Sequence, residues 1–239
     1  MIKPITCMVH YNRDEWTKFS VHTFLSNTNL PLLVIDNSPD HNFNDLVVSD
    51  RVTVVINESE KKSHGDGLDL AVGWCWRNEF THIVLIEHDC VIGGMKWFVA
   101  LCDKANEGFA HAYSFRQPHG AHPCPSIWQV NEIHHSFAEI IKGEDKNEEF
   151  YKSIDIDASD STYQDEYWDT GIKNWYELEK LGKSIKIDKQ EDFMHCWVCS
   201  YKEEVIKLMD RAGWNKLIRD YNADSSPSRR VDICHKGSA

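Results

Sequence analysis

The chain has 239 residues, of which 41% are hydrophobic, and this is enough for one domain with a sizeable core. Its formal net charge of −12 disfavours nucleic acid and anionic membranes as partners unless basic residues cluster locally. No apolar run reaches the roughly 20 residues that span a bilayer, and the first residues lack the order of a signal peptide, so we expect a cytoplasmic protein without an integral membrane segment.

The first part of the chain alternates short apolar runs with stretches of helical periodicity. Strands are predicted at residues 5–11, 32–35, 52–56 and 82–86, and helices at residues 14–26 and 67–78, the first with Asp14 as its N-cap. Runs that are apolar on both faces indicate parallel strands covered by helices. The alternation therefore predicts an α/β fold with a doubly wound, mostly parallel sheet.

The second part is less regular. The predicted order is a strand at 109–115, a loop at 117–126 over the site, a helix at 170–181 that ends at Gly182, strands at 184–187 and 193–199, and a helix at 202–221. Residues 225–239 form a polar tail.

Polar residues follow three of the predicted strands, as Tyr11-Asn12-Arg13, Asp36-Asn37-Ser38 and Glu87-His88-Asp89. In an open parallel sheet, ligands bind at the carboxyl ends of the strands, so these segments are expected to meet at one crevice. Glu87 and Asp89 bring two carboxylates into one turn, and a hard divalent cation prefers such oxygen ligands. The alternative is that the two acids only form the turn, but the polar ends of the other strands favour a metal site.

Taken together, these segments resemble GT-A glycosyltransferases, especially the inverting family-2 type. Glu87-His88-Asp89 resembles the metal-binding Asp-x-Asp motif, with Glu87 in place of the usual first Asp. Tyr11-Asn12-Arg13 is similar to the strand ending that opens the nucleotide pocket, and Asp36 to the acid that contacts the base. Residues 57–71 resemble the loop and helix start beside the diphosphate and ribose, although Asp69 stands where Asn is common.

The resemblance implies a GT-A (Rossmann-like) fold, in which a mostly parallel sheet is flanked by helices, with acceptor-side loops and a C-terminal helix. It implies a single domain over residues 1–222, with a nucleotide-sugar-binding half at 1–100, an acceptor-binding half at 101–200, and a polar tail at 223–239. Residues 142–165 are acidic and polar, and form either a mobile loop or an acceptor-facing insertion.

The implied activity is metal-dependent, inverting transfer of a sugar from a nucleotide-diphosphate donor, expected to be a UDP-sugar, to an acceptor hydroxyl. Mn²⁺ or Mg²⁺ would be held by Glu87, Asp89 and His195, since residues 191–197 resemble the segment that often supplies a His ligand. The predicted donor-binding residues are His10, Tyr11, Asn12, Arg13, Asp36, Asn37, Asn57, Lys62, His64, Gly65, Asp69 and His88. For Lys62 and His64 a solvated loop is an equal alternative to diphosphate binding.

A general base must take the proton from the acceptor hydroxyl, and a carboxylate at a helix start near the crevice suits this role. Asp169 is the first candidate because it precedes Gly182 by nearly the family's spacing, and Asp165 and Glu166 come next. Asp169 also reads as an ordinary N-cap. Aromatic faces stack on sugars or fill cores, and we expect a functional residue among Trp128, Trp168 and Trp175.

The cysteines and the remaining histidines give no metal signature. The 8 cysteines lack framework spacing and are expected to be reduced thiols. Cys196 and Cys199 have no partner pair at zinc-ribbon spacing. Four further histidines form no recognised ligand spacing, and a loop role is expected for them rather than metal binding: His119, His122, His134 and His135.

Three alternatives to sugar transfer onto a conventional acceptor stay open. A nucleotidyltransferase would carry a glycine-rich, basic loop after the first strand, which Tyr11-Asn12-Arg13 does not provide. A noncatalytic nucleotide-sugar or glycan-binding module would keep the fold without the base. A viral-type glycosyltransferase acting on hydroxymethylated DNA bases fits the length, but Lys61-Lys62 and Arg229-Arg230 are the only basic clusters. The acceptor class, whether glycan, lipid-linked, protein or modified base, is not determined.

Overall fold

The structure is a computed structural model that describes residues 1–11, 14–39, 49–60, 62–114, 116–117, 120–139, 170–187 and 191–195. The predicted helix at 202–221, the polar tail and the acidic stretch at 142–165 lie outside these residues.

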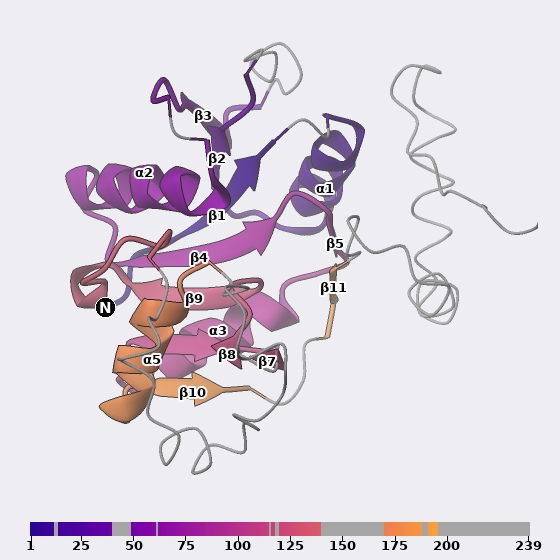
Figure 1. Cartoon of the computed structure of the whole chain (residues 1–239). Helices are drawn as coiled ribbons and strands as arrows, with labels where there is room; N and C mark the ends of the chain where they lie inside the picture. The colour runs from indigo at the N-terminus through magenta and orange to yellow at the C-terminus, as the bar shows by residue number, and fades with distance from the viewer. Residues whose placement is uncertain are drawn as a thin grey trace, which may run out of the picture.

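A seven-stranded sheet forms the centre of the molecule, with strand order β10-β6-β9-β4-β1-β2-β3 (Figure 1). The strands are β1 (Pro4–His10), β2 (Leu32–Asp36), β3 (Val52–Ile56), β4 (His82–Glu87), β6 (His111–Tyr113), β9 (Ser126–Gln129) and β10 (Ser184–Lys186). Strands β4, β1, β2 and β3 run parallel to one another, and β10 is parallel to β6. Only β9 is antiparallel to its neighbours β4 and β6 within this sheet. The predicted mostly parallel α/β sheet is therefore confirmed.

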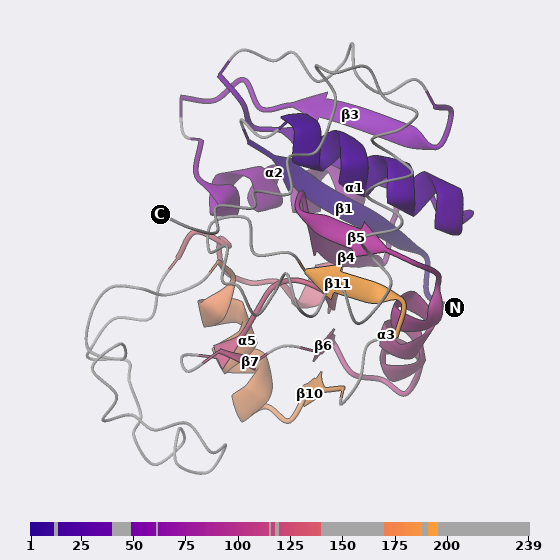
Figure 2. The same ribbon diagram turned by 90° about the vertical axis from the view of Figure 1, so that its right-hand side faces the viewer.

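Helices cover both faces of the sheet (Figures 1 and 2). Helices α2 (His64–Arg77) and α5 (Ile172–Lys180) pack on the face that includes Ile5, Cys7 and Val9 of β1. Helices α1 (Asp14–Asn27) and α3 (Lys96–Asn106) pack on the opposite face with Met8. Alternate side chains of β1 are therefore buried in two separate hydrophobic clusters, one on each face of the sheet, because successive strand side chains point to opposite faces. Within the described ranges, no helix is long and apolar enough to cross a membrane.

Two small antiparallel sheets lie beside the main one, and a short 3₁₀ turn (Val130–Glu132) follows β9. Strand β5 (Cys90–Ile92) pairs with β11 (Phe193–His195), and β7 (Arg116–Gln117) pairs with β8 (Gly120–Ala121). The β5–β11 register sets His195 opposite Cys90, next to the turn that follows β4.

Several boundaries differ from the sequence predictions. Helix α2 begins three residues before the predicted position because Ser63 and Asp66 form a capping box that satisfies the first free amides. The predicted loop at 117–126 contains β8 and ends at β9, a buried strand that carries Trp128. Neither β9 nor α3 was predicted. A four-residue strand directly after the turn-forming Pro123 and Pro125 has too little periodicity to be recognised from sequence.

Glycines on α2 provide a test of its packing. A Cβ at Gly65 would lie 2.6 Å from the backbone of Ala138, whereas one at Gly73 would meet nothing closer than 3.7 Å, the end of Arg77. We expect Gly65→Ala to lower the free energy of unfolding by about 1–3 kcal/mol through overpacking. Gly73→Ala, in the same helix, should raise it by about 0.5–1 kcal/mol through helix propensity. Urea denaturation of both variants checks this, and equal effects would contradict the packing role of Gly65.

Candidate active site

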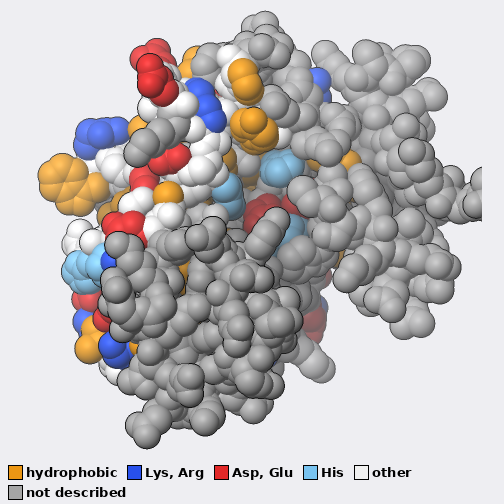
Figure 3. All heavy atoms as spheres, in the orientation of Figure 1, with side chains coloured by type: hydrophobic (Ala, Val, Ile, Leu, Met, Phe, Trp, Pro, Cys, Tyr) orange, Lys and Arg blue, Asp and Glu red, His pale blue; other side chains and the backbone are white. Residues whose placement is uncertain are grey.

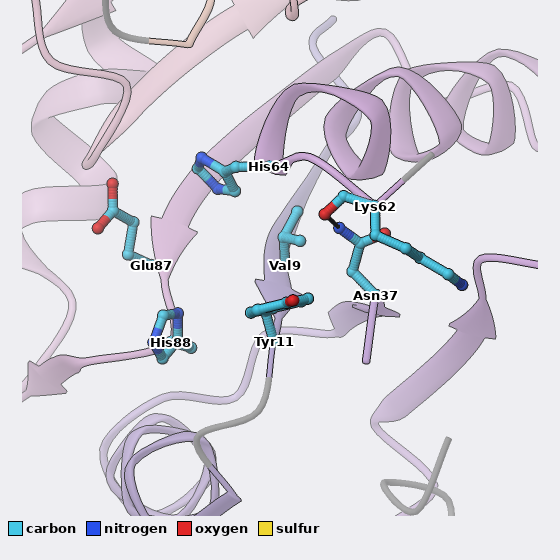
Figure 4. Close-up of a pocket in the computed structure, with 7 residues that line it drawn as sticks. All are labelled: Val9, Tyr11, Asn37, Lys62, His64, Glu87 and His88. Carbon is cyan, nitrogen blue, oxygen red and sulfur yellow. Dashed lines mark hydrogen bonds between the residues drawn. The ribbon is translucent and has the colours of Figure 1, made fainter. Parts of the chain in front are cut away.

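A cavity of about 430 Å³ opens at the carboxyl ends of the parallel strands (Figure 4). It is lined by Val9, Tyr11, Asn37, Lys62, His64, Glu87 and His88. These residues come from the ends of β1, β2 and β4 and from the start of α2, so the structure brings together the three strand endings singled out in the sequence. In the space-filling view, histidine and acidic side chains gather in a hollow on this face (Figure 3).

A hydrogen-bond network between buried amides fixes the start of α2 at the cavity. Asn37 Nδ2 donates to the carbonyl oxygens of Lys62 (2.7 Å) and Ser63 (2.9 Å). Asn57 Nδ2 in turn donates to Asn37 Oδ1 at 2.6 Å, and Lys62 Nζ donates to the Asn57 carbonyl. The network holds Lys62 and His64 at the positive end of the helix dipole, where backbone amides favour anions.

Other predicted donor-binding residues hold the protein together around the cavity and do not line it. Asp36 is fully buried, and its Oδ1 accepts from the Ser38 amide at 3.0 Å. His10 Nδ1 lies 2.7 Å from Thr17 Oγ1 in the interior. Asp69 accepts hydrogen bonds from Ser136 Oγ and from the Phe137 amide, the latter at 2.7 Å.

The Asp69 contacts and the close approach of Gly65 to Ala138 dock the 136–138 segment on α2. The donor-binding roles of Asp36, His10, Asp69 and Gly65 therefore stay predictions. Asn12 and Arg13 lie outside the described residues.

Glu87, Asp89 and His195 converge, although His195 is 106 positions from Asp89 in the chain. His195 Nε2 lies 2.8 Å from Glu87 Oε2 and 3.0 Å from Asp89 Oδ1. Burial opposes the charge on Glu87, but His195 holds the pKa of that carboxyl below its usual range. Burial also opposes charge on His195, but Glu87 and Asp89 raise the pKa of this imidazole to about 12.

His122 joins this group, which sequence reasoning missed. Its Nε2 lies 3.5 Å from Glu87 Oε1, and ligand atoms of Glu87, His122 and His195 lie within 4.8 Å of one another. His122 is a loop residue, as predicted, but the structure places its imidazole beside Glu87 and His195, which its spacing along the chain did not indicate. We call Glu87, Asp89, His122 and His195 the carboxylate–histidine cluster.

The cluster has the dimensions of a metal site. Two atoms bound to one ion at about 2.1 Å stand about 3.0–3.5 Å apart in octahedral or tetrahedral geometry. The separations of 3.0 and 3.5 Å fall within this range and the separation of 2.8 Å lies just below it, and the donors are carboxylate oxygens and imidazole nitrogens. The residues present therefore fit a divalent cation.

The predicted roles of the tryptophans and of the N-cap need correction. Trp128 and Trp175 are buried in the core, and Trp128 stacks on His111 with ring centroids 3.7 Å apart, so neither presents a face to a sugar. Helix α5 begins at Ile172 with Gly171 in the N-cap position, so Asp169 is not its N-cap. The candidate bases Asp165, Glu166 and Asp169, and also Trp168, lie outside the described residues.

Comparison with known proteins identifies the fold. No protein-family model and no curated protein matches the chain. Among solved structures, 4-diphosphocytidyl-2C-methyl-D-erythritol synthase superposes with a TM-score of 0.54 at 10% identity, over 89% of this chain and 99% of that one. At this identity the match shows the fold alone, which is the GT-A type that the sequence predicted.

Structures of S. aureus TarS also match. TarS 1–349 superposes with a TM-score of 0.49 at 11% identity, over 95% of this chain and 68% of that one. Its complex with UDP-GlcNAc gives 0.48 at 11% identity, over 95% and 69%.

Proposed function

We propose that this chain is a metal-dependent glycosyltransferase that moves a sugar from a nucleotide-diphosphate donor, a UDP-sugar, to an acceptor hydroxyl with inversion. The observation that carries the proposal is the position of the carboxylate–histidine cluster. Glu87 belongs both to the cluster and to the wall of the 430 Å³ cavity, whose other side is formed by Lys62, His64 and the start of α2. The cluster that would hold a cation and the N-terminus of α2 thus lie on two sides of a space of ligand size.

Residues of different chemistry line different parts of the cavity, and their positions support one orientation of the donor. The diphosphate lies between the cluster and the α2 N-terminus, where Lys62, His64 and the positive end of the helix dipole meet its charge. The nucleoside lies toward Tyr11, a residue that is 45% exposed and offers an aromatic face. His88 stands between Glu87 and Asp89 in the sequence, and its side chain contributes to the cavity wall beside Tyr11.

Glu87, Asp89 and His195 would hold Mn²⁺ or Mg²⁺, which as a Lewis acid stabilises the charge of the leaving nucleotide diphosphate. Asp169 takes the proton from the acceptor hydroxyl as that oxygen attacks the anomeric carbon. One contact supports the assignment of the base. Thr170 Oγ1, in the next residue along the chain, lies 3.3 Å from Nδ1 of His64 in the cavity wall.

The fold alone also suits a nucleotidyltransferase, but the connection after β1 argues against that activity. Strand β1 ends at His10 and α1 begins at Asp14, so three residues join them. This connection has no glycine and is too short for the glycine-rich, basic loop on which that activity depends. A noncatalytic binding module would bind the donor without releasing nucleotide diphosphate when acceptors are added.

The first test is metal-dependent stabilisation by UDP. A ligand at 100 times its dissociation constant adds about 2.7 kcal/mol to the stability of the native state. We expect UDP to raise the melting temperature clearly more in Mn²⁺ than in chelator. Uridine, which lacks the diphosphate, serves as the control and should give the same small shift in both conditions. Equal shifts for UDP with and without Mn²⁺ would rule out a role for the metal in donor binding.

A further inference from the structure

His122 is placed against Glu87 by the loop that precedes β9. Its side chain is 4% exposed, its Nε2 lies 3.5 Å from Glu87 Oε1, and its ring centroid is 5.1 Å from that of His195. The pattern of two acids in one turn does not require this second imidazole. Its position therefore calls for a separate explanation.

The loop that carries His122 is attached to β4 beside Glu87. The Glu87 amide donates to Cys124 Sγ at 3.1 Å, and Cys124 Sγ lies 3.3 Å from Cys90 Sγ of β5. Ser126 Oγ donates to the Pro123 carbonyl within the same loop. These contacts fix the loop on the strand that supplies Glu87 and on the strand that follows Asp89. The imidazole of His122 is thus held at the cluster by the fold.

The backbone around His122 accommodates the tautomer that a metal ligand needs. In one tautomer Nδ1 donates to the Cys124 carbonyl oxygen, 2.9 Å away, and in the other Nδ1 accepts a hydrogen bond from the Cys124 amide at 3.1 Å. When Nδ1 carries the proton, it donates to this carbonyl, and Nε2 presents its lone pair toward Glu87. Histidines that bind metals commonly donate their other N–H to a backbone carbonyl in this way, which fixes the ring orientation.

We propose that His122 is a fourth protein ligand of the divalent cation, and that the site selects a first-row transition ion over Mg²⁺. Two imidazoles and two carboxylates suit such ions, whereas Mg²⁺ prefers oxygen donors and retains several waters. This inference deepens the proposed function, because it names the class of ion on which donor binding depends.

The test is metal affinity measured by calorimetry, with Co²⁺ and Mg²⁺ as probes and no sugar donor present. In His122→Gln we expect the Co²⁺ dissociation constant to rise at least about tenfold, and that of Mg²⁺ to change by less than about threefold. The visible absorption of bound Co²⁺, which reports its ligands, should change as well. His134→Gln is the matched control, because the side chain of His134 is 64% exposed and outside the cluster. It should bind both ions like the unaltered protein.

A second measurement needs no variant and covers the case in which His122→Gln does not fold. In ¹⁵N spectra of the histidine side chains, Zn²⁺ should shift two Nε2 signals, and a single shifted signal would overturn the proposal. An unchanged Co²⁺ affinity in folded His122→Gln, or equal affinities of the unaltered protein for Co²⁺ and Mg²⁺, would also overturn it and leave the glycosyltransferase proposal intact. Failure of the unaltered protein to bind any ion would contradict both.

Discussion

Glu87→Gln is expected to abolish metal-dependent binding of UDP. Glu87 is the one member of the cluster that contacts both imidazoles and lines the cavity, at 2.8 Å from His195 and 3.5 Å from His122. Gln keeps the shape but removes the negative charge that a cation requires. Loss of a supporting residue typically costs 10- to 100-fold in metal affinity, so loss of this ligand should cost at least about 100-fold.

The measurement is the Mn²⁺-dependent part of the melting-temperature shift that UDP produces. Glu107→Gln is the matched control, since Glu107 lies at the end of α3 with half of its side chain exposed and pairs only locally with Lys104. That variant should retain the full shift. Circular dichroism in the absence of metal verifies that Glu87→Gln folds. A folded Glu87→Gln protein with the full Mn²⁺-dependent shift would remove the cluster from the proposed mechanism.

Asp169→Asn is expected to lower turnover by about 100- to 10,000-fold, the usual contribution of a general base. Donor affinity should change little, because the base acts on the acceptor proton only as the transition state forms. Since Gly171 occupies the N-cap position of α5, the substitution does not remove a cap from that helix. Release of UDP from a UDP-sugar in the presence of acceptor gives the rate, and calorimetry gives the donor affinity.

Asp103→Asn, on the exposed side of α3, is the control for the loss of one negative charge and should retain normal turnover. Near-normal turnover of Asp169→Asn would exclude Asp169 as the base and make Asp165 and Glu166 the next candidates. A rate that falls in parallel with donor affinity would instead indicate a binding role.

The parallel half of the sheet could be predicted from sequence because its signals are local. Strands β1, β2 and β4 are short apolar runs buried on both faces, and each is followed by polar residues at the edge where ligands bind. Glu87 and Asp89 could be proposed as ligands for the same reason. Strand β9 gave no comparable signal, since its four residues are recognisable only by their pairing with β4 and β6.

Residue types near the cavity were easier to predict than their contacts. Asn37, Asn57 and Asp69 lie in the predicted region, yet their side chains bind the protein's own backbone and one another. An amide or carboxylate has the same local sequence signal whether it binds a ligand or a neighbouring loop. The identity of its partner depends on which segments pack against it.

The sequence by itself determined the α/β class, the edge of the sheet that carries the site and the acidic pair at the end of β4, because each is encoded by neighbouring residues. Only the tertiary structure decided that His122 lies beside Glu87, and it showed His195 in contact with both acids, as the family resemblance had implied. His122 lies on the loop before β9, which the Cys124 contacts hold in place. His195 lies on β11, which the pairing with β5 holds in place. No spacing along the chain encodes such a meeting, since it results from packing between distant segments.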